Sequence, residues 1–410
     1  MERERTDILV SGGGVAGLAA AAAFGAAGFS VICVDPAPPV TDRDAEGADL
    51  RTTAILQPGR NVLAAAGLWD RLSPHAMPLQ VMRIVDAGGP DPEPRLTRDF
   101  DAADISDAPF GWNLPNWLLR REMVAHLATL PNVSFRPGRA TAGVVAREAE
   151  ALVRLSDGGT VSARLLVAAD GRASPVREAL GIGVRTLRYG QKALAFAVTH
   201  PIPHQNVSIE VHRSGGPFTL VPLPDWQGSP SSAVVWMERG PEARRLAALP
   251  VPAFEAEMSA RSGHVLGPLT LASRITSWPI ISQIAERFCG PRTALMAEAA
   301  HVVPPIGAQG LNMSLADLAV LVELASADRA GLGGPAMLAA YQRRRRAEVN
   351  ARVLGVDALN RASMAGAPAL RDLRARALDL LYGAAPVRRT LMRVGLGAAP
   401  AAAGADQAAP

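Results

Sequence analysis

Two short apolar runs near the N-terminus flank a stretch of small residues. Residues 7–11 (DILVS) and 30–35 (SVICVD) have the composition of β-strands, and the Ala-rich stretch between them ends at Gly28, where a helix C-cap is expected. Strand, helix and strand in this order predict a βαβ unit with parallel strands. The next predicted elements are a helix over 61–72, mixed strands and loops over 74–115, and a helix over 117–130.

The middle of the chain changes from helical spacing to alternation. Strands over 144–155 and 164–169 flank the turn signal DGG at 157–159, which predicts a hairpin. From about 185 to 280 apolar and polar residues alternate; within 207–212, three aliphatic residues share one face and three polar residues the other. This pattern is typical of a half-buried antiparallel sheet and marks a second domain inserted into the first.

The last third returns to buried elements and helices. A strand at 293–297 is followed by a loop rich in Pro and Gly, and then by helices over 315–326 and 336–363. Residues 397–410 are almost all Ala, Gly and Pro, a composition that predicts disorder.

The composition is that of a folded protein with a large core, because 49% of the 410 residues are apolar and 20% are charged. The net charge of +4 is small, Lys192 is the only lysine, and no basic stripe is interleaved with aromatic residues, so nucleic acid is not an expected partner. Cys33 and Cys289 cannot build a disulfide framework, and a reducing cytoplasm is expected. No His and carboxylate spacing predicts a metal site, and no run reaches the roughly 20 apolar residues of a membrane span.

The first motif follows the first strand directly. Gly12, Gly14 and Gly17 form the pattern GxGxxG, whose glycines allow a tight turn and let a pyrophosphate approach the N-terminus of the next helix. Asp35, at the end of the second strand, is placed to accept hydrogen bonds from ribose hydroxyls. Alone, this motif indicates a dinucleotide and does not separate NAD from FAD.

The second motif, DGRASPVR, follows the strand that ends near residue 169. It brings Asp170, Gly171, Ser174 and Arg177 to one strand end, where a carboxylate, a flexible turn, a hydroxyl and a guanidinium could serve a cofactor. The alternative is an Asp-Gly turn followed by a helix with an N-cap serine.

The third motif is AEAAHVVPPIGAQGLNMSLAD at 297–317. Glu298 could bind ribitol hydroxyls, and Gly307 and Gly310 leave backbone N–H groups free to face an electron-rich ring. The alternatives are a surface acid that caps a helix and an inert connecting loop.

In this order, the three motifs resemble those of the class A flavoprotein monooxygenases, which share the para-hydroxybenzoate hydroxylase fold. The runs DLRTTAIL (49–56), GPFTLVPLP (216–224), PPIGAQGLNMSLAD (304–317), YQRRRR (341–346) and VDALN (356–360) are similar to the ubiquinone-biosynthesis hydroxylase branch. The resemblance covers everything except the C-terminal tail.

The resemblance implies FAD as cofactor and NAD(P)H as co-substrate. The chain departs from the pattern at Ala297, where a glycine is usual, and at Asp35, the shorter acid. By position, the ADP half of FAD would be held by Gly12, Gly14, Val15, Ala16, Gly17 and Asp35, and its pyrophosphate would be supported by Asp170 and Gly171. Arg51 would contact FAD near the active-site cleft, and Arg120 would be a further FAD contact. Glu298 would bind ribitol, and the isoalloxazine would be lined by Pro305, Gly307, Gly310, Leu311 and Asn312.

The expected fold class is α/β, with a Rossmann-like FAD-binding domain, an inserted and mainly antiparallel substrate domain, and C-terminal helices. The FAD-binding domain is predicted from 1–75, 116–184 and 281–345, the substrate domain from 76–115 and 185–280, the C-terminal helices from 346–396, and the tail from 397–410.

The implied reaction is hydroxylation of an aromatic ring with O2 through a flavin hydroperoxide, the expected substrate being a polyprenylated phenol of ubiquinone biosynthesis. His301 is a candidate general base, and the alternative is that it orients Glu298 or the loop. Phe218, Leu220 and Pro222 are interpreted either as an apolar roof of the substrate cleft or as plain sheet core.

Other functions stay open on the sequence. The enzyme could hydroxylate another aromatic, such as a soluble phenol or a polyketide, or it could be a flavin-binding but non-catalytic member of a quinone-biosynthesis complex. An NAD-dependent dehydrogenase would use the first motif and leave the other two without a role.

A basic amphipathic pattern near the C-terminus suggests a membrane partner. Val387, Leu391 and Val394 recur at helical spacing, while three arginines occupy other positions of the same helix. Such a helix can rest on anionic lipid at the inner face of the cell membrane, and the alternative is a helix packed on its own domain.

Overall fold

The predicted βαβ unit lies at the centre of an eight-stranded sheet in the computed structural model, which describes residues 3–88, 93–213, 215–364 and 368–396. Strand β1 (Glu4–Ser11), helix α1 (Val15–Ala26) and strand β2 (Val31–Asp35) confirm the unit, and β1 pairs in parallel with β2 and with β11. Gly28 has a φ of 79° just after α1, as expected of a residue that ends a helix. The tail 397–410, predicted to be disordered, lies outside the described residues.

The rest of this sheet follows the order β18-β19-β11-β1-β2-β8, with β10 and β9 added antiparallel beside β11. The turn at 157–159 is confirmed, because the N–H of Leu155 donates to the carbonyl of Gly159. The single strand predicted over 144–155 was wrong, since a turn divides it into two strands. The strands are β8 (Val133–Pro137), β9 (Thr141–Ala146), β10 (Ala151–Leu155), β11 (Thr160–Ala168), β18 (Cys289–Gly290) and β19 (Thr293–Leu295).

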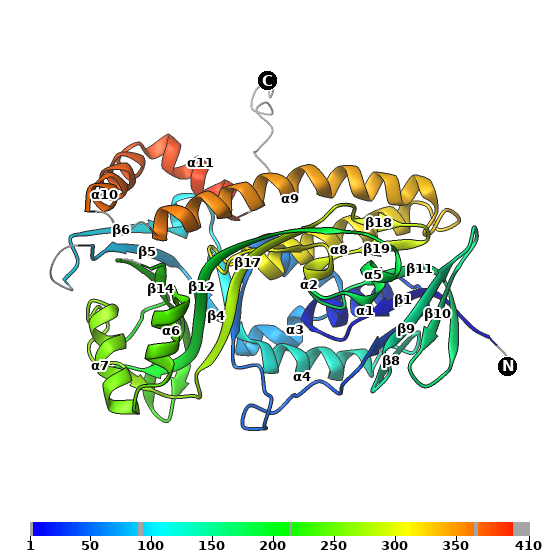
Figure 1. Cartoon of the computed structure of the whole chain (residues 1–410), viewed down its shortest axis with the longest axis horizontal. Coiled ribbons are helices and arrows are strands. Elements are labelled where there is room, and N and C mark those ends of the chain that lie inside the picture. The colour runs from blue at the N-terminus through cyan, green and yellow to red at the C-terminus, as the bar shows by residue number, and fades with distance from the viewer. Residues whose placement is uncertain (1–2, 89–92, 214, 365–367, 397–410) are drawn as a thin grey trace, which may run out of the picture.

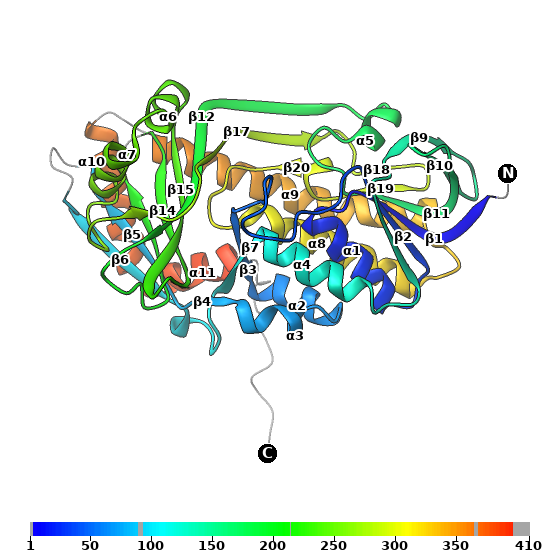
Figure 2. The ribbon, with the colours of Figure 1, turned by 90° about the horizontal axis from the view of Figure 1, so that it is seen from below.

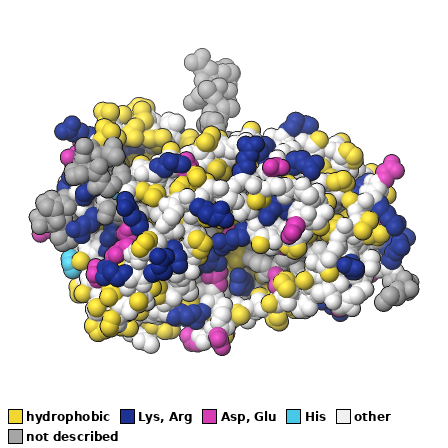
Figure 3. All heavy atoms as spheres, in the orientation of Figure 1, with side chains coloured by type: hydrophobic (Ala, Val, Ile, Leu, Met, Phe, Trp, Pro, Cys, Tyr) yellow, Lys and Arg dark blue, Asp and Glu magenta, His cyan; other side chains and the backbone are white. Residues whose placement is uncertain are grey.

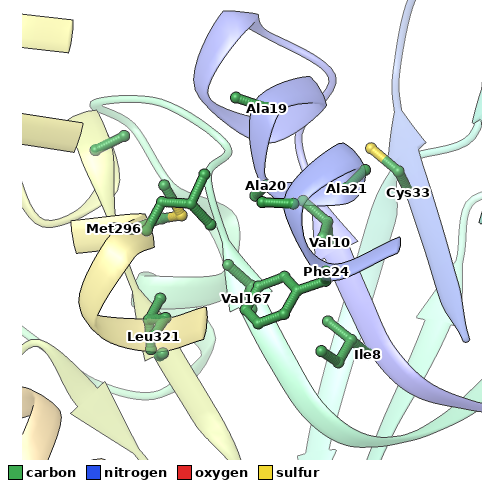
Figure 4. Close-up of a cluster of buried hydrophobic side chains, with 14 of the residues drawn as sticks. Ile8, Val10, Ala19, Ala20, Ala21, Phe24, Cys33, Val167, Met296 and Leu321 are labelled. Carbon is green, nitrogen blue, oxygen red and sulfur yellow. The ribbon is translucent and has the colours of Figure 1, made fainter. Parts of the chain in front are cut away.

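Helix α1 packs against this sheet through alanines (Figure 4). Ala19, Ala20 and Ala21 are fully buried, and Phe24 fills the space that these small side chains leave beside Val167. Alanine costs no side-chain entropy in a helix, and its small size lets the helix lie close to the strands. The glycine loop before α1 is therefore held on a rigid support.

The prediction of one continuous helix over 61–72 was wrong. The segment forms two short helices, α2 (Gln57–Ala65) and α3 (Trp69–Leu72), because Gly67, at a φ of 73°, turns the chain between them. Helix α4 (Asn116–Leu127) confirms the next predicted helix and lies beside α1 (Figure 2). The short 3-10 turns η1 (Ser73–His75) and η2 (Ala102–Asp104) occur in the connections.

A nine-stranded, mainly antiparallel sheet forms the second lobe, in the order β20-β17-β12-β15-β14-β13-β5-β6 with β16 beside β12. The alternation predicted for 207–212 is confirmed, because Ile209 and Val211 are buried in the core of this lobe. Strands β12 and β17 run from this lobe to the first (Figures 1 and 2). The strands are β5 (Val81–Asp86), β6 (Leu96–Asp101), β12 (Val184–Thr199), β13 (Val207–His212), β14 (Pro217–Trp226), β15 (Ser229–Arg239), β16 (Thr270–Leu271), β17 (Thr276–Ala285) and β20 (His301–Val302).

Helices α6 (Gly240–Ala247) and α7 (Val251–Arg261) interrupt the segment from about 185 to 280, which was predicted to be a mainly antiparallel sheet. Phe254 and Met258 of α7 are buried against the sheet, so these helices cover one of its faces. A third sheet joins the lobes in the order β3-β7-β4, formed by β3 (Thr52–Leu56), β7 (Gly111–Pro115) and β4 (Met77–Leu79).

The C-terminal third is helical. Helix α9 (Pro335–Met364) crosses both lobes along the top of Figure 1, while α10 (Pro368–Gly383) and α11 (Ala385–Leu396) lie near β5 and β6. Helix α8 (Gln309–Ala327) begins six residues before its predicted start and, by length and composition alone, could cross a membrane. Its residues Leu315, Leu318 and Leu321 are instead packed in the protein core.

Candidate functional site

The order of the parallel strands brings the three sequence motifs to one edge. Strands β19, β11, β1 and β2 are consecutive neighbours and run in the same direction, so their carboxyl ends share that edge. Gly12 follows β1, Asp35 ends β2, Asp170 follows β11 and Glu298 follows β19. In open α/β sheets this edge is where ligands bind.

The glycine loop combines tight packing with an open approach. A Cβ at Gly17 would lie 1.8 Å from the carbonyl oxygen of Gly12, and Gly12 itself has a φ of 110°. A Cβ at Gly14 would meet no atom within 4 Å. Gly14 begins α1 without a side-chain cap, so the first N–H groups of the helix, at Val15, Ala16 and Gly17, are placed for an anion.

The Asp35 carboxylate holds the loop in this shape. Its oxygens accept hydrogen bonds from the N–H groups of Gly13, at 2.6 Å, and Ala37, at 3.0 Å. Each carboxylate oxygen retains a further lone pair, so the ribose contact stays a prediction.

The second motif forms the turn and the capped helix of its alternative interpretation, and its cofactor contact stays a prediction. The hydroxyl of Ser174 accepts from the N–H of Arg177 and caps α5 (Pro175–Ala179), while Gly171 makes the turn at a φ of 86°. Asp170 Oδ1 is buried and has no hydrogen-bond partner among the described residues, and burial raises the pKa of this carboxyl. An unpaired polar atom beside the glycine loop is what an unfilled cofactor contact would leave.

The third motif is joined to the second through Arg177, whose guanidinium donates to the carbonyls of Ala299 and Arg172. Glu298 lies in the 3-10 turn η3 (Ala297–Ala299), half exposed and 3.7 Å from the guanidinium of Arg172. The departure at Ala297 has a structural consequence. Its φ is 55°, a conformation that costs a non-glycine residue roughly 1–2 kcal/mol.

Arg51 is fixed by a residue that the sequence analysis did not single out. Asp49 accepts two hydrogen bonds of 2.7 Å from Arg51 and one from Asn116, and Arg120 lies 3.7 Å away. The hydrogen bonds to Asp49 raise the pKa of Arg51, which also lies over the ring of Trp278. Nothing in the local sequence separates Asp49 from an ordinary surface acid.

Asn312 ties the beginning of α8 to the edge of β3. Its amide nitrogen donates to the carbonyl of Ala54, and its amide oxygen accepts from the N–H of Leu56, as a neighbouring strand would. Ala308, the residue before α8, has a φ of 56° and no side-chain cap. Among the other residues predicted to line the isoalloxazine, Leu311 is half-buried, and the exposed ones are Pro305, Gly307 and Gly310.

His301 belongs to a buried ionic cluster. Its Nε2 lies 2.7 Å from Asp317 Oδ2, while Asp317 Oδ1 accepts from Arg345 at 2.7 Å and the N–H of Ala297 reaches Oδ2 at 3.0 Å. Burial raises the pKa of Asp317, but His301 and Arg345 lower it by more, so the carboxyl pKa lies below its ordinary value. Because the His301 side chain is 1% exposed, this geometry favours an orienting role over direct proton transfer.

The three residues interpreted as a cleft roof lie on β14. Phe218 and Leu220 belong to the core that α7 covers, and Pro222 shares their side of the strand. The opposite side carries Thr219 and Val221. These two neighbour Val235 and Ala233 of β15 in the sheet.

That opposite side, which we call the inner face, packs toward the third motif. It contributes Ala193, Met237 and Ile280 to a cluster with Ile306 of the third motif and Val356 of α9. Of the two interpretations offered for Phe218 and Leu220, the structure therefore places them in the sheet core.

Comparison with known proteins gives the family. The model of the FAD binding domain family matches residues 5–354. The chain belongs to this family. It is 37% identical over 396 residues to ubiquinone hydroxylase UbiL of Rhodospirillum rubrum, covering 95% of this chain and 89% of that protein. It is 27% identical to the 3-demethoxyubiquinol 3-hydroxylase of Escherichia coli, covering 97% and 100%.

Among solved structures, p-nitrophenol 4-monooxygenase PnpA of Pseudomonas putida aligns over 97% of this chain and 98% of that one, with a TM-score of 0.77 and 19% identity. This likeness confirms the α/β fold. The flavoenzyme is an FAD-dependent monooxygenase.

The residues present fit FAD. The open approach at Gly14, the uncapped N-terminus of α1 and the unpaired Asp170 Oδ1 lie at the same sheet edge. The uncapped N-terminus of α8 adds free N–H groups beside Gly310, where a Cβ would again meet no atom within 4 Å.

Replacing Gly14 with valine tests the pyrophosphate position. The φ of Gly14 is −69°, which valine adopts, and its side chain would point into open space. We expect the unfolding midpoint of the FAD-free protein to stay unchanged and FAD affinity, measured by flavin fluorescence titration, to fall at least tenfold. Gly355→Val, at an open position of α9, is the matched control and should bind FAD normally. Undiminished FAD binding by Gly14→Val would show that the pyrophosphate does not bind at this loop.

Replacing Asp317 with asparagine should destabilise the protein by about 3 kcal/mol, since Arg345 would lose its buried carboxylate partner and keep only the part-exposed Glu348. Urea unfolding measures this loss. Because the folded-state pKa of Asp317 is lowered, its stabilisation is present above the unfolded pKa and is lost as the pH falls through the folded pKa. Glu323→Gln, an exposed acid of α8 paired with Arg344, should change stability by less than about 1 kcal/mol. Equal losses of unfolding free energy in the two variants would contradict a stabilising role for the buried cluster around Asp317.

Proposed function

We propose that the flavoenzyme hydroxylates the aromatic ring of a polyprenylated phenol in ubiquinone biosynthesis. The carrying observation is the similarity to ubiquinone hydroxylase UbiL along 95% of the chain. The inner face supports a hydrophobic substrate, because Ala193, Val235, Met237 and Ile280 present only apolar side chains toward Ile306.

FAD held by the glycine loop and the third motif would, when reduced by NAD(P)H, activate O2 for the transfer of one oxygen atom to an electron-rich ring. The chain's own contribution is to hold the ring and to keep water away from it. The apolar inner face serves the second task. Two hydrogen bonds to Asp49 hold the guanidinium of Arg51 in one position, over the ring of Trp278.

Turnover by the purified holoenzyme tests this function. We expect a prenylated phenol, offered in detergent with NADH or NADPH, to increase O2 uptake and to gain one oxygen atom by mass spectrometry. Preferential hydroxylation of short soluble phenols would instead favour the alternative aromatic substrate. Bound FAD that no phenol causes to turn over would favour a non-catalytic member of a quinone-biosynthesis complex.

We also propose that the C-terminal helices rest on the inner face of the cell membrane, with the protein otherwise in the cytoplasm. Apolar side chains gather over α10 and α11 at the upper left of Figure 3. Large hydrophobic side chains are exposed along α9, α10 and α11, namely Leu354, Leu359, Leu373, Leu380, Leu381, Val387, Leu391 and Val394, and we call these residues the apolar patch.

The charges around the apolar patch favour an anionic lipid surface. Asp372 and Asp379 of α10 are paired with Arg95, the residue before β6, and with Arg98 of β6. Arg376, Arg389 and Arg393 are exposed and have no ion-pair partner among the described residues. In α11, Val387, Leu391 and Val394 are each at least 44% exposed, so the apolar side of this helix is not its packed side.

Vesicle binding tests the membrane contact. Leu380 is 77% exposed and Leu391 47%, and changing both to aspartate should weaken co-sedimentation with phosphatidylglycerol-containing vesicles at least tenfold, because two apolar contacts are lost and two negative charges gained. Val145→Asp, 60% exposed on β9, should bind like the wild type. Equal binding by all three proteins would contradict the contact, whereas hydroxylation in detergent would be unaffected.

A further inference from the structure

A buried amide between the two lobes has an unused acceptor. Asn113 of β7 is 1% exposed, and its Nδ2 donates to the carbonyl of Pro222 on β14 at 2.9 Å. Its Oδ1 is buried and has no hydrogen-bond partner among the described residues. A buried acceptor without a donor is costly in free energy, so such an atom calls for a physical explanation.

The direction of this side chain follows from its strand. Trp112 and Leu114 pack with the core of the first lobe, so Asn113 points from the other face of β7, toward β14. The carbonyl of Pro222 also fixes the amide orientation, because exchanging its oxygen and nitrogen would set two acceptors against each other. Oδ1 is therefore the atom left free to accept.

The position of Asn113 is tied to the third motif. Asn312 bonds to one edge of β3, at Ala54 and Leu56, and β7 pairs with the other edge, where Asn113 is the register partner of Ala54. Since adjacent strands lie about 5 Å apart, Asn113 is roughly 10 Å from the beginning of α8. A substituted aromatic ring can extend across this distance.

We propose that Asn113 Oδ1 accepts the hydrogen bond of the substrate's phenolic hydroxyl and thereby selects a phenol over its ether. A ligand that brings a donor satisfies this atom, and the ring hydroxyl is the donor of the proposed substrate class. Met77, the half-buried register partner of Asn113 on β4, has the unbranched side chain that can change rotamer to admit the hydroxyl. This assignment rests on the proposed function.

A ligand and protein double-mutant cycle tests the contact in the FAD-loaded enzyme. The probes are 2-geranylphenol and its methyl ether, and their dissociation constants are measured from the change in the spectrum of bound FAD. We expect the wild type to prefer the phenol by about three- to tenfold, the usual effect of one neutral hydrogen bond. Asn113→Leu should bind both probes equally, with ether affinity unchanged. Asn61→Leu, an exposed asparagine of α2, should keep the preference.

The outcomes separate the contact from the function. If Asn113→Leu keeps the wild-type preference, or if the wild type shows none while still hydroxylating the phenol, the role of Asn113 is wrong and the proposed function stands. If the wild type neither binds nor hydroxylates the phenol, both are wrong. Asn113→Val, smaller and favoured in strands, answers the same question if the leucine variant does not fold.

Discussion

The site depends on the parallel order of β19, β11, β1 and β2, which sets four carboxyl ends side by side. Parallel strands need crossover connections, so segments far apart in the chain meet at one edge. Gly12, Asp170 and Glu298 are separated by more than a hundred residues at each step and still lie at the same edge of the sheet. The contact between the Gly12 turn and Ala169, where a Cβ would lie 2.4 Å from a carbonyl oxygen, shows how closely two of these ends approach.

The third motif is held in place by two side chains that act on backbone groups. Asp317 accepts hydrogen bonds from the N–H of Ala297 and from Arg345, and it also contacts His301. Asn312 forms with β3 the two hydrogen bonds that a neighbouring strand would form. Both side chains come from α8, so one helix positions the turn that carries Glu298 and the loop that precedes the helix. The left-handed backbone of Ala297 is held by the same contacts, as strained residues at functional sites commonly are.

The catalytic and lipid-facing proposals concern different surfaces of one molecule. The cluster of Ala193, Met237 and Ile280 on the inner face is apolar and buried, whereas the apolar patch of α9, α10 and α11 is exposed and bordered by arginines. A prenylated phenol carries a polar ring and a long apolar chain, and it resides in the bilayer. The apolar patch therefore suits the bilayer in which such a substrate resides.

Periodicity and glycine spacing alone determined the βαβ unit, the turn at 157–159, the alternation within 207–212 and the motif residues that line the sheet edge. These features are local, because each depends on neighbours within a few residues. The break at Gly67, helices α6 and α7, and the burial of Phe218 depended on packing partners that no local pattern contains. The tertiary structure alone decided that Asp49, Asp317 and Asn113 matter, since each acquires its partners from strands and helices distant in the chain.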